Sequence, residues 1–170
     1  MPIIPKSAFP VFAFVAVLVA AAPASAEDCS YTDLHGEFTV AADCAGLQDF
    51  SGIAQPHKRL WLSGPWGQLE IMEVPSPYQA VELDVIMESL GRYWSKGRTP
   101  GALSSTTIAG LDARVVTERK LRTTSRTWAF NLGGRNLTAR AVAYGKRKAR
   151  EANLELIAKA FETGFRASGE

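Results

Sequence analysis

The 170-residue sequence is poor in the residues that most often carry chemistry. It has two cysteines and two histidines, too few for a scaffold built on disulfides or for a four-ligand zinc site. It contains no G-x-S-x-G elbow, no P-loop and no G-x-G-x-x-G turn, so serine hydrolases, nucleotide hydrolases and dinucleotide enzymes lack local support. His35 and His57 have no second ligand at helical spacing. We therefore predict a protein that is not an enzyme and that holds no metal and no cofactor.

Neither sign of charge is in excess over the whole chain. There are 19 basic and 17 acidic residues, a net charge of +2. Nucleic-acid-binding domains are usually strongly basic or carry a recognisable motif, and this sequence shows neither. Nucleic acid is therefore not an expected partner. Apolar residues make up 46% and charged residues 21%, which is the balance of an ordinary globular domain.

A long apolar run occurs at the N-terminus and nowhere else in the sequence. Residues 8–22 are almost wholly apolar, Lys6 precedes them, and Ala24-Ser25-Ala26 follows. A positive start, a short apolar core and an A-x-A end are typical of a cleavable export signal, and the run is short for a membrane span of about 20 residues. We predict a signal peptide over residues 1–26, with an uncleaved anchor as the alternative. Residues 27–170 would then form a single periplasmic or secreted domain with no transmembrane span.

Export changes the expected state of the two cysteines. In an oxidising compartment, Cys29 and Cys44 are expected to form a disulfide. A closed loop of about 15 residues contributes about 3 kcal/mol in the chain-entropy model. The alternative is a redox or metal-binding pair, but the C-x-x-C spacing typical of such pairs is absent.

Alternation of polar and apolar residues predicts a β-rich chain. We expect strands over residues 36–41, 58–62, 68–74, 106–109, 113–121, 124–132 and 135–144. Gly133-Gly134 predicts a tight two-residue hairpin between the last two strands. Residues 63–67 predict a five-residue loop between the second and third.

Two helices are expected between and after these strands. Ser76, Pro77 and Gln79 match the N-cap, first position and third position of a capping box, which predicts a helix from Ser76 to about residue 95. Its apolar stripe consists of Leu83, Met87, Leu90 and Trp94. A second helix is expected over residues 149–166. With residues 106–109 and 113–121 counted together across Gly110, the order is β-β-β-α-β-β-β-α. This order indicates an α+β domain with both helices packed on one antiparallel sheet.

This order and several short motifs resemble the Mog1/PsbP-like superfamily. Phe38-Thr39-Val40 is similar to its opening strand, and residues 107–113 are similar to the strand that follows its first helix. Gly133-Gly134 resembles its late hairpin, and residues 157–161 resemble its terminal helix. The resemblance implies a non-catalytic domain that binds a partner or assists an assembly. It transfers no binding residue, because members of such a fold bind through different surfaces.

Charge is distributed very unevenly along the chain. Residues 27–91 contain 11 acids and two bases, a net charge of −9, whereas residues 114–150 contain 11 bases and one acid, a net charge of +10. A cationic surface at the start of a helix attracts anions. We therefore predict docking to an anionic envelope component, namely a lipid headgroup, a cell-wall polymer or an acidic protein. The candidate contacts are Arg126 and Arg140 on a strand face, Lys146, Arg147, Lys148 and Arg150 at the helix start, and Trp66 at an exposed turn tip.

Three alternatives to the docking hypothesis remain open. The basic block could be a solvated face that the acidic half neutralises. The protein could carry a small ligand or lipid, if the apolar stripe of the first helix leaves a pocket against the sheet. It could be a hydrolase of unrecognised type, if a carboxylate pair is buried in a cleft.

The export signal predicts a defined mature N-terminus. Protein recovered from the periplasm of an expressing bacterium should begin at Glu27, because the peptidase cleaves after the small-residue site. Intact-mass measurement checks this. Recovery of the full-length chain in the membrane fraction would instead establish the uncleaved anchor.

Overall fold

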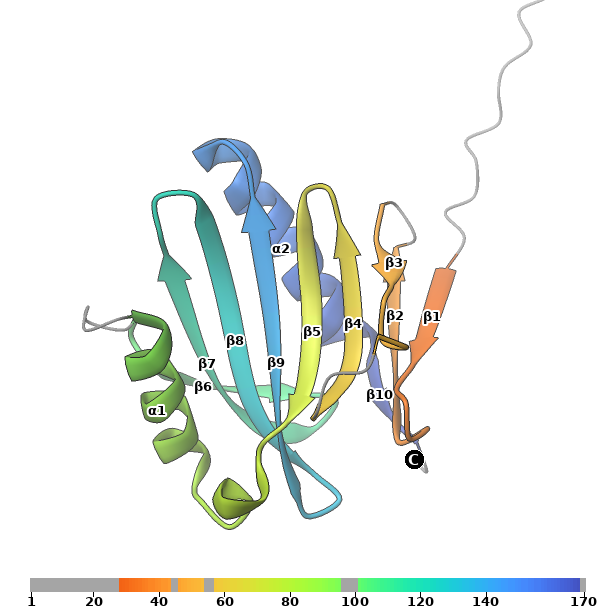
Figure 1. The fold of residues 1–170 in the computed structure, drawn as a ribbon, viewed down its shortest axis with the longest axis vertical. Helices are drawn as coiled ribbons and strands as arrows, with labels where there is room; N and C mark the ends of the chain where they lie inside the picture. The colour runs from red at the N-terminus through yellow and green to blue at the C-terminus, as the bar shows by residue number, and fades with distance from the viewer. Residues whose placement is uncertain (1–27, 44–45, 54–56, 96–100, 169–170) are drawn as a thin grey trace, which may run out of the picture.

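A computed structural model of the chain describes residues 28–43, 46–53, 57–95 and 101–168 (Figure 1). The predicted signal segment and Cys44 lie outside these residues. Cleavage and the Cys29–Cys44 disulfide therefore stay predictions, although Cys29 itself lies in a strand, opposite Ala42. Among the described residues, no helix is long and apolar enough to cross a membrane.

Two antiparallel sheets form the framework. The larger has seven strands in the order β3-β4-β5-β9-β8-β7-β6, and the smaller has three in the order β1-β2-β10. The strands of the larger sheet are β3 (Gln48–Asp49), β4 (Lys58–Gly64), β5 (Gly67–Glu73), β6 (Ser104–Ile108), β7 (Leu111–Arg119), β8 (Thr123–Leu132) and β9 (Arg135–Tyr144). Those of the smaller sheet are β1 (Asp28–Thr32), β2 (Phe38–Asp43) and β10 (Phe165–Ala167).

The two helices lie on opposite faces of the larger sheet. Helix α2 (Arg147–Gly164) runs along the face turned away from the viewer in Figure 1, and α1 (Leu83–Ser95) lies on the near face over β7 and β8. The α+β class with two helices packed on antiparallel strands is therefore confirmed. The expected strand count was too low. The short strands β1 and β3 were missed because two to five residues carry too little alternation to be recognised. Strand β10 was missed because the predicted second helix extended over residues 165–166, whereas α2 ends at Gly164.

The main core lies between α2 and both sheets, and it is rich in aromatic rings. Phe161 of α2 contacts Trp128 with ring centroids 4.9 Å apart and Phe165 at 5.6 Å. Phe165 also packs against Phe38 of the smaller sheet, at 5.1 Å. These rings are fully buried, and each such pair adds about 0.5–1.5 kcal/mol beyond its burial. The cluster joins the smaller sheet to the larger one through the helix.

The turns show where the sequence patterns hold and where they fail. Gly133 and Gly134 have φ angles of 57° and 83°, as a type I′ turn requires, so the tight hairpin is confirmed. The loop between β4 and β5 is shorter than expected. The strands extend to the Gly64–Gly67 pair and leave Pro65 and Trp66 between them.

The first helix begins later than the capping box indicates. Residues 76–78 form a short 3-10 turn, η1 (Ser76–Tyr78), and its N-cap position is held by Pro75 without a side-chain hydrogen bond. Gln79 does not fold back to cap a helix. Its side-chain amide instead donates to the Val74 carbonyl and its side-chain oxygen accepts from the Asn136 amide, so tertiary contacts override the local motif.

A buried arginine connects the N-terminal hairpin to the larger sheet. Arg59 of β4 is 2% exposed. Its Nε lies 2.9 Å from Asp33, and its terminal nitrogens lie 2.7 Å from Glu37 and 3.1 Å from Glu73. Asp33 also accepts the backbone amides of Glu37 and Phe38. A charge removed from water in this way is tolerated because nearly every polar atom around it has a partner.

Replacement of Arg59 should strongly destabilise the fold. In Arg59→Met the fully buried carboxylate of Asp33 loses its counter-charge, which costs about 3–5 kcal/mol. Urea unfolding measures the loss. Arg135→Gln is the matched control, because Arg135 is also paired with Glu37 but is 40% exposed, so its loss costs no more than about 1 kcal/mol. Equal effects of the two variants would contradict a special role for Arg59.

Candidate functional site

Arg126 and Arg140, which were expected to form one surface, lie on opposite faces of the larger sheet. Arg126 of β8 pairs with Ala141 of β9, and Arg140 pairs with Thr127. Paired residues share a face and successive residues alternate, so Arg126 lies on the α2 face and Arg140 on the other. The expectation that both side chains form one strand surface is therefore wrong. The cause is the register that the two-residue Gly133-Gly134 turn sets, because it pairs Arg126 with Ala141, one residue away from Arg140.

Arg126 is occupied by the acidic side of α2. Its terminal nitrogens lie 2.6 Å from Glu155 and 3.7 Å from Glu162, and its Nε lies 3.4 Å from the Thr117 hydroxyl. Glu162 also accepts from the Trp128 indole at 3.2 Å. Arg126 thus closes the core on this face. The positive charge is neutralised by α2 rather than by the acidic N-terminal half.

Arg140 belongs to a mixed-charge row on the opposite face. It pairs in register with Glu70 of β5, and the Lys58 ammonium lies 3.5 Å from the same carboxylate and 3.9 Å from the centre of the Trp61 ring. Burial raises the pKa of the nearby Tyr144 phenol, Glu70 raises it further, and Arg140 opposes the shift. This row is therefore an internal electrostatic network and not an open cationic surface.

The predicted bases at the start of α2 lie at one end of the molecule, where they meet further bases of the β7–β8 turn (Figure 1). Arg119 and Arg147 both approach Glu151, at 3.7 Å and 3.6 Å. We call this region the basic end. It comprises Arg119, Lys120, Arg122, Lys146, Arg147 and Lys148, together with Leu121 among them.

The centre of the basic end is an exposed leucine. Leu121 at the tip of the β7–β8 turn is 92% exposed. Arg150, which was expected to face a partner, is instead buried, and its Nη1 donates to the Leu121 carbonyl at 2.9 Å. Arg150 thereby fixes the turn against α2. Sequence reasoning missed Leu121, although a leucine between Lys120 and Arg122 in a turn is a visible signal.

The start of α2 has no acidic residue to offset its dipole. The N-cap residue Lys146 makes no side-chain capping bond, and the first turn contains no acid. Backbone N–H groups at such a terminus favour an anion. The Lys146, Arg147 and Lys148 side chains are all exposed, so the predicted cationic helix start is present as a surface.

Trp66 is not the exposed contact that its position in a turn suggests. The side chain is half-buried and packs against the main core. A Cβ atom on Gly46 would lie 2.8 Å from its indole nitrogen, which shows how closely the ring lies against that segment. Use of Trp66 in partner binding stays a prediction without support from its placement.

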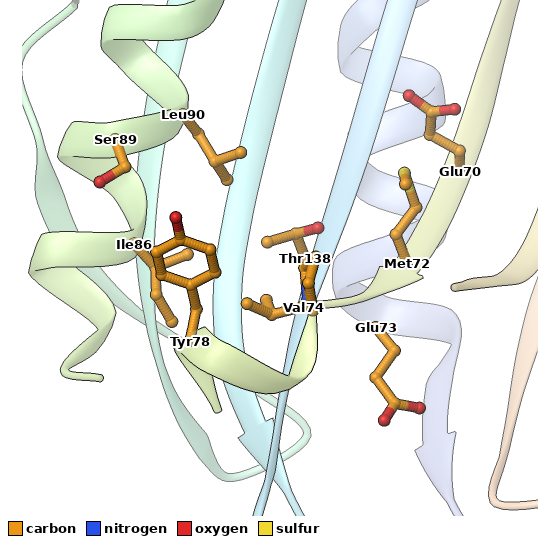
Figure 2. A pocket seen from close by; sticks show the side chains of 10 residues that line it. Glu70, Met72, Glu73, Val74, Tyr78, Ile86, Ser89, Leu90 and Thr138 are labelled. Atoms are coloured by element: carbon orange, nitrogen blue, oxygen red, sulfur yellow. The ribbon is translucent and has the colours of Figure 1, made fainter. Parts of the chain in front are cut away.

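A mainly apolar pocket of about 400 Å³ lies on the α1 face of the sheet (Figure 2). It lies between α1, η1 and the strands β5 and β9. Its walls include Met72, Val74, Tyr78, Ile86, Leu90 and Thr138. The apolar stripe of α1 therefore does not close fully on the sheet. Met87 is buried beside Val116 and Ala129, Leu90 faces the pocket, and the side chain of Trp94 lies outside the described part of the chain.

Asn136 holds the wall of the pocket that carries Tyr78. Its side-chain amide donates to the carbonyls of Gln79 at 3.0 Å and Val81 at 2.9 Å, and its backbone amide donates to the Gln79 side chain at 2.7 Å. Asn136 also begins an N-x-T sequon, but the residue is 5% exposed. The amide that a glycan would modify is thus committed to the pocket wall.

The acidic residues of the site are paired with bases. Glu70 and Glu73 both line the pocket, but Lys58 binds the first and Arg59 the second. Asp33, His35 and Glu37 place possible metal ligands within 4.8 Å of one another, yet both of these carboxylates bind Arg59. Neither group has the free carboxylates that acid–base or metal chemistry requires.

Comparison with known proteins shows which solved structures share this fold. No protein-family model matches the sequence, and a search of curated proteins found no match either. Among solved structures, the chain is similar to cyanobacterial PsbP (CyanoP) from Synechocystis sp. PCC 6803, with a TM-score of 0.58 and 11% identity over 88% of this chain and 98% of that one. The chain therefore has a PsbP-like fold, as the resemblance in the sequence implies.

Two further structures are similar at lower scores. A protein from Bacteroides thetaiotaomicron has a TM-score of 0.49 and 14% identity over 83% of this chain and 48% of that one. A Pseudomonas aeruginosa protein of unknown function has a TM-score of 0.45 and 14% identity over 80% of this chain and 94% of that one.

Loss of the Asn136 side chain should loosen the pocket wall. In Asn136→Ala the Gln79 and Val81 carbonyls lose their donor, and an unsatisfied buried group costs about 1–3 kcal/mol. Hydrogen exchange of the amides in residues 74–81 should accelerate more than exchange in β8. Unchanged exchange in this segment would show that the wall is held by other contacts.

Proposed function

We propose that this chain is an exported, non-catalytic accessory protein that docks on anionic lipid headgroups through the basic end. The observation that carries the proposal is Leu121, an almost fully exposed aliphatic side chain surrounded by cations. The PsbP-like fold is compatible with an accessory role. The pairing of Glu70 and Glu73 with bases argues against acid–base catalysis in the pocket.

The two segments that form the basic end carry a net positive charge. Residues 118–122 and 146–151 contain seven bases and two acids, a net charge of +5. One of these acids, Glu118, is buried, and the other, Glu151, is shared by Arg119 and Arg147. These two arginines are 68% and 83% exposed, so their ion pairs are weak and exchange readily with an external anion.

The leucine selects a lipid surface over other anionic partners. An anionic polymer would satisfy the cations but would give the Leu121 side chain no apolar surroundings, and an acidic protein would do so only through a matching apolar pocket. A bilayer offers headgroup phosphates and acyl chains at adjacent depths, so both features bind together. Each basic side chain near an anionic membrane contributes about 1 kcal/mol, and full burial of a leucine contributes about 1.5–3 kcal/mol. Together, these electrostatic and apolar contributions predict reversible, salt-sensitive binding.

Vesicle sedimentation tests the proposal directly. Protein recovered after export should bind vesicles that contain phosphatidylglycerol, should not bind pure phosphatidylcholine, and should dissociate in high salt. Lys146→Gln/Lys148→Gln should weaken binding by roughly 2 kcal/mol, or about 30-fold. Leu121→Ser should weaken it without changing its salt dependence. The matched control is Lys159→Gln/Arg166→Gln, which removes the same charge from exposed positions elsewhere.

Three outcomes would overturn the proposal. Equal weakening by both double variants would mean that net charge acts without a site. Full binding by Leu121→Ser would remove the apolar contact. Binding to an anionic cell-wall polymer or to an acidic protein, without binding to vesicles, would assign the basic end to one of the other predicted partner classes.

A further inference from the structure

The geometry points to a second site, independent of the basic end: the pocket between α1 and the sheet binds a small, uncharged, mainly apolar molecule. Its volume of about 400 Å³ falls within the usual range of about 300–1,000 Å³ for ligand pockets. Figure 2 shows Leu90 and Thr138 extending into the space from opposite walls, with the Tyr78 ring between α1 and Val74.

The pocket exists because α1 is anchored to one side of the sheet. Ile86 and Met87 are buried against Val116 and Ala129, and Arg114 pairs with Asp84 at 2.5 Å. These contacts fix the helix over β7 and β8. The surface of β5 and β9 beside it, including Met72 and Thr138, is left without an apolar cover from α1. Apolar surface of this kind gains free energy when a ligand removes it from water.

The opposite wall is rigid. The segment that carries Tyr78 is fixed by the Asn136 hydrogen bonds to Gln79 and Val81, and β5 is paired with β9 along its full length from Gly67 to Glu73. A preformed cavity of this kind binds its ligand without a large ordering cost. The pocket is therefore a site that is ready for a ligand, not a loosely packed region that collapses when empty.

The charges of the lining define the class of ligand. Among the side chains that the structure describes, Glu70 and Glu73 line the pocket and no lysine or arginine does. Their counter-ions, Lys58 and Arg59, are both buried, and neither is part of the lining. An anionic ligand would therefore meet carboxylates whose cations are already paired with them, and a charge placed against the apolar walls is costly. An uncharged molecule fits, with the Tyr78 and Thr138 hydroxyls available to a polar end.

A matched pair of fluorescent probes tests both the site and its selectivity. The first probe, N-phenylnaphthylamine, is uncharged, and the second, anilinonaphthalenesulfonate, has the same aromatic frame with an anionic group. The exported protein should bind the first saturably. Thr138→Phe should lower that affinity about tenfold or more, because the new ring occupies the volume that the ligand needs. The control is Thr107→Phe at an exposed position of β6, which should leave it unchanged.

The anionic probe separates this site from the basic end. If the anionic probe binds in the pocket, Thr138→Phe should remove that binding, and its affinity there should be about tenfold lower than that of the uncharged probe. Binding of the anionic probe that Lys146→Gln/Lys148→Gln removes instead takes place at the basic end. Probe binding that Thr138→Phe leaves intact would overturn the pocket assignment. Equal affinity for both probes in the Thr138-dependent site would overturn the restriction to uncharged ligands. Thr138→Phe should retain vesicle binding, so the two proposals fail separately.

Discussion

The fold depends on one arginine that is almost completely removed from water. Arg59 lies where the N-terminal hairpin meets the larger sheet, and its guanidinium contacts carboxylates from both. Hydrophobic burial alone would allow the hairpin to shift along the larger sheet, whereas an arginine guanidinium binds carboxylates in only a few geometries. The Asp33 carboxylate that this guanidinium binds also accepts the Phe38 amide, so the same contact helps to hold Phe38 in the aromatic core.

The two faces of the larger sheet differ in how completely a helix covers them. The face under α2 is closed by aromatic side chains, and its polar margin is neutralised by contacts such as Arg126 with Glu155. The other face is only partly covered, because α1 is shorter and lies to one side. The basic end and the apolar pocket both lie outside the α2 core, the first at the end of the sheet and the second beside α1.

Periodic patterns in the sequence predicted much of the fold but little of the site. The Gly133-Gly134 hairpin and the apolar face of α2 were predictable because turn chemistry and helical spacing are local. The same turn fixes the register that puts Arg126 and Arg140 on opposite faces. Their partners, Glu155 of α2 and Glu70 of β5, were not predictable, because they lie in segments distant along the chain. The role of Asn136 was also hidden, since its partners lie 55 to 58 residues away in the chain.

The bond from Arg150 to the Leu121 carbonyl has a consequence for how the tip of the β7–β8 turn behaves. Exposed hairpin tips usually sample many conformations, and that freedom is lost on association. Here the buried guanidinium ties the tip to the first turns of the longest helix, so the molecule meets that entropic cost during folding. The backbone of Leu121 is therefore held in place by a buried residue of α2 while its side chain extends into solvent.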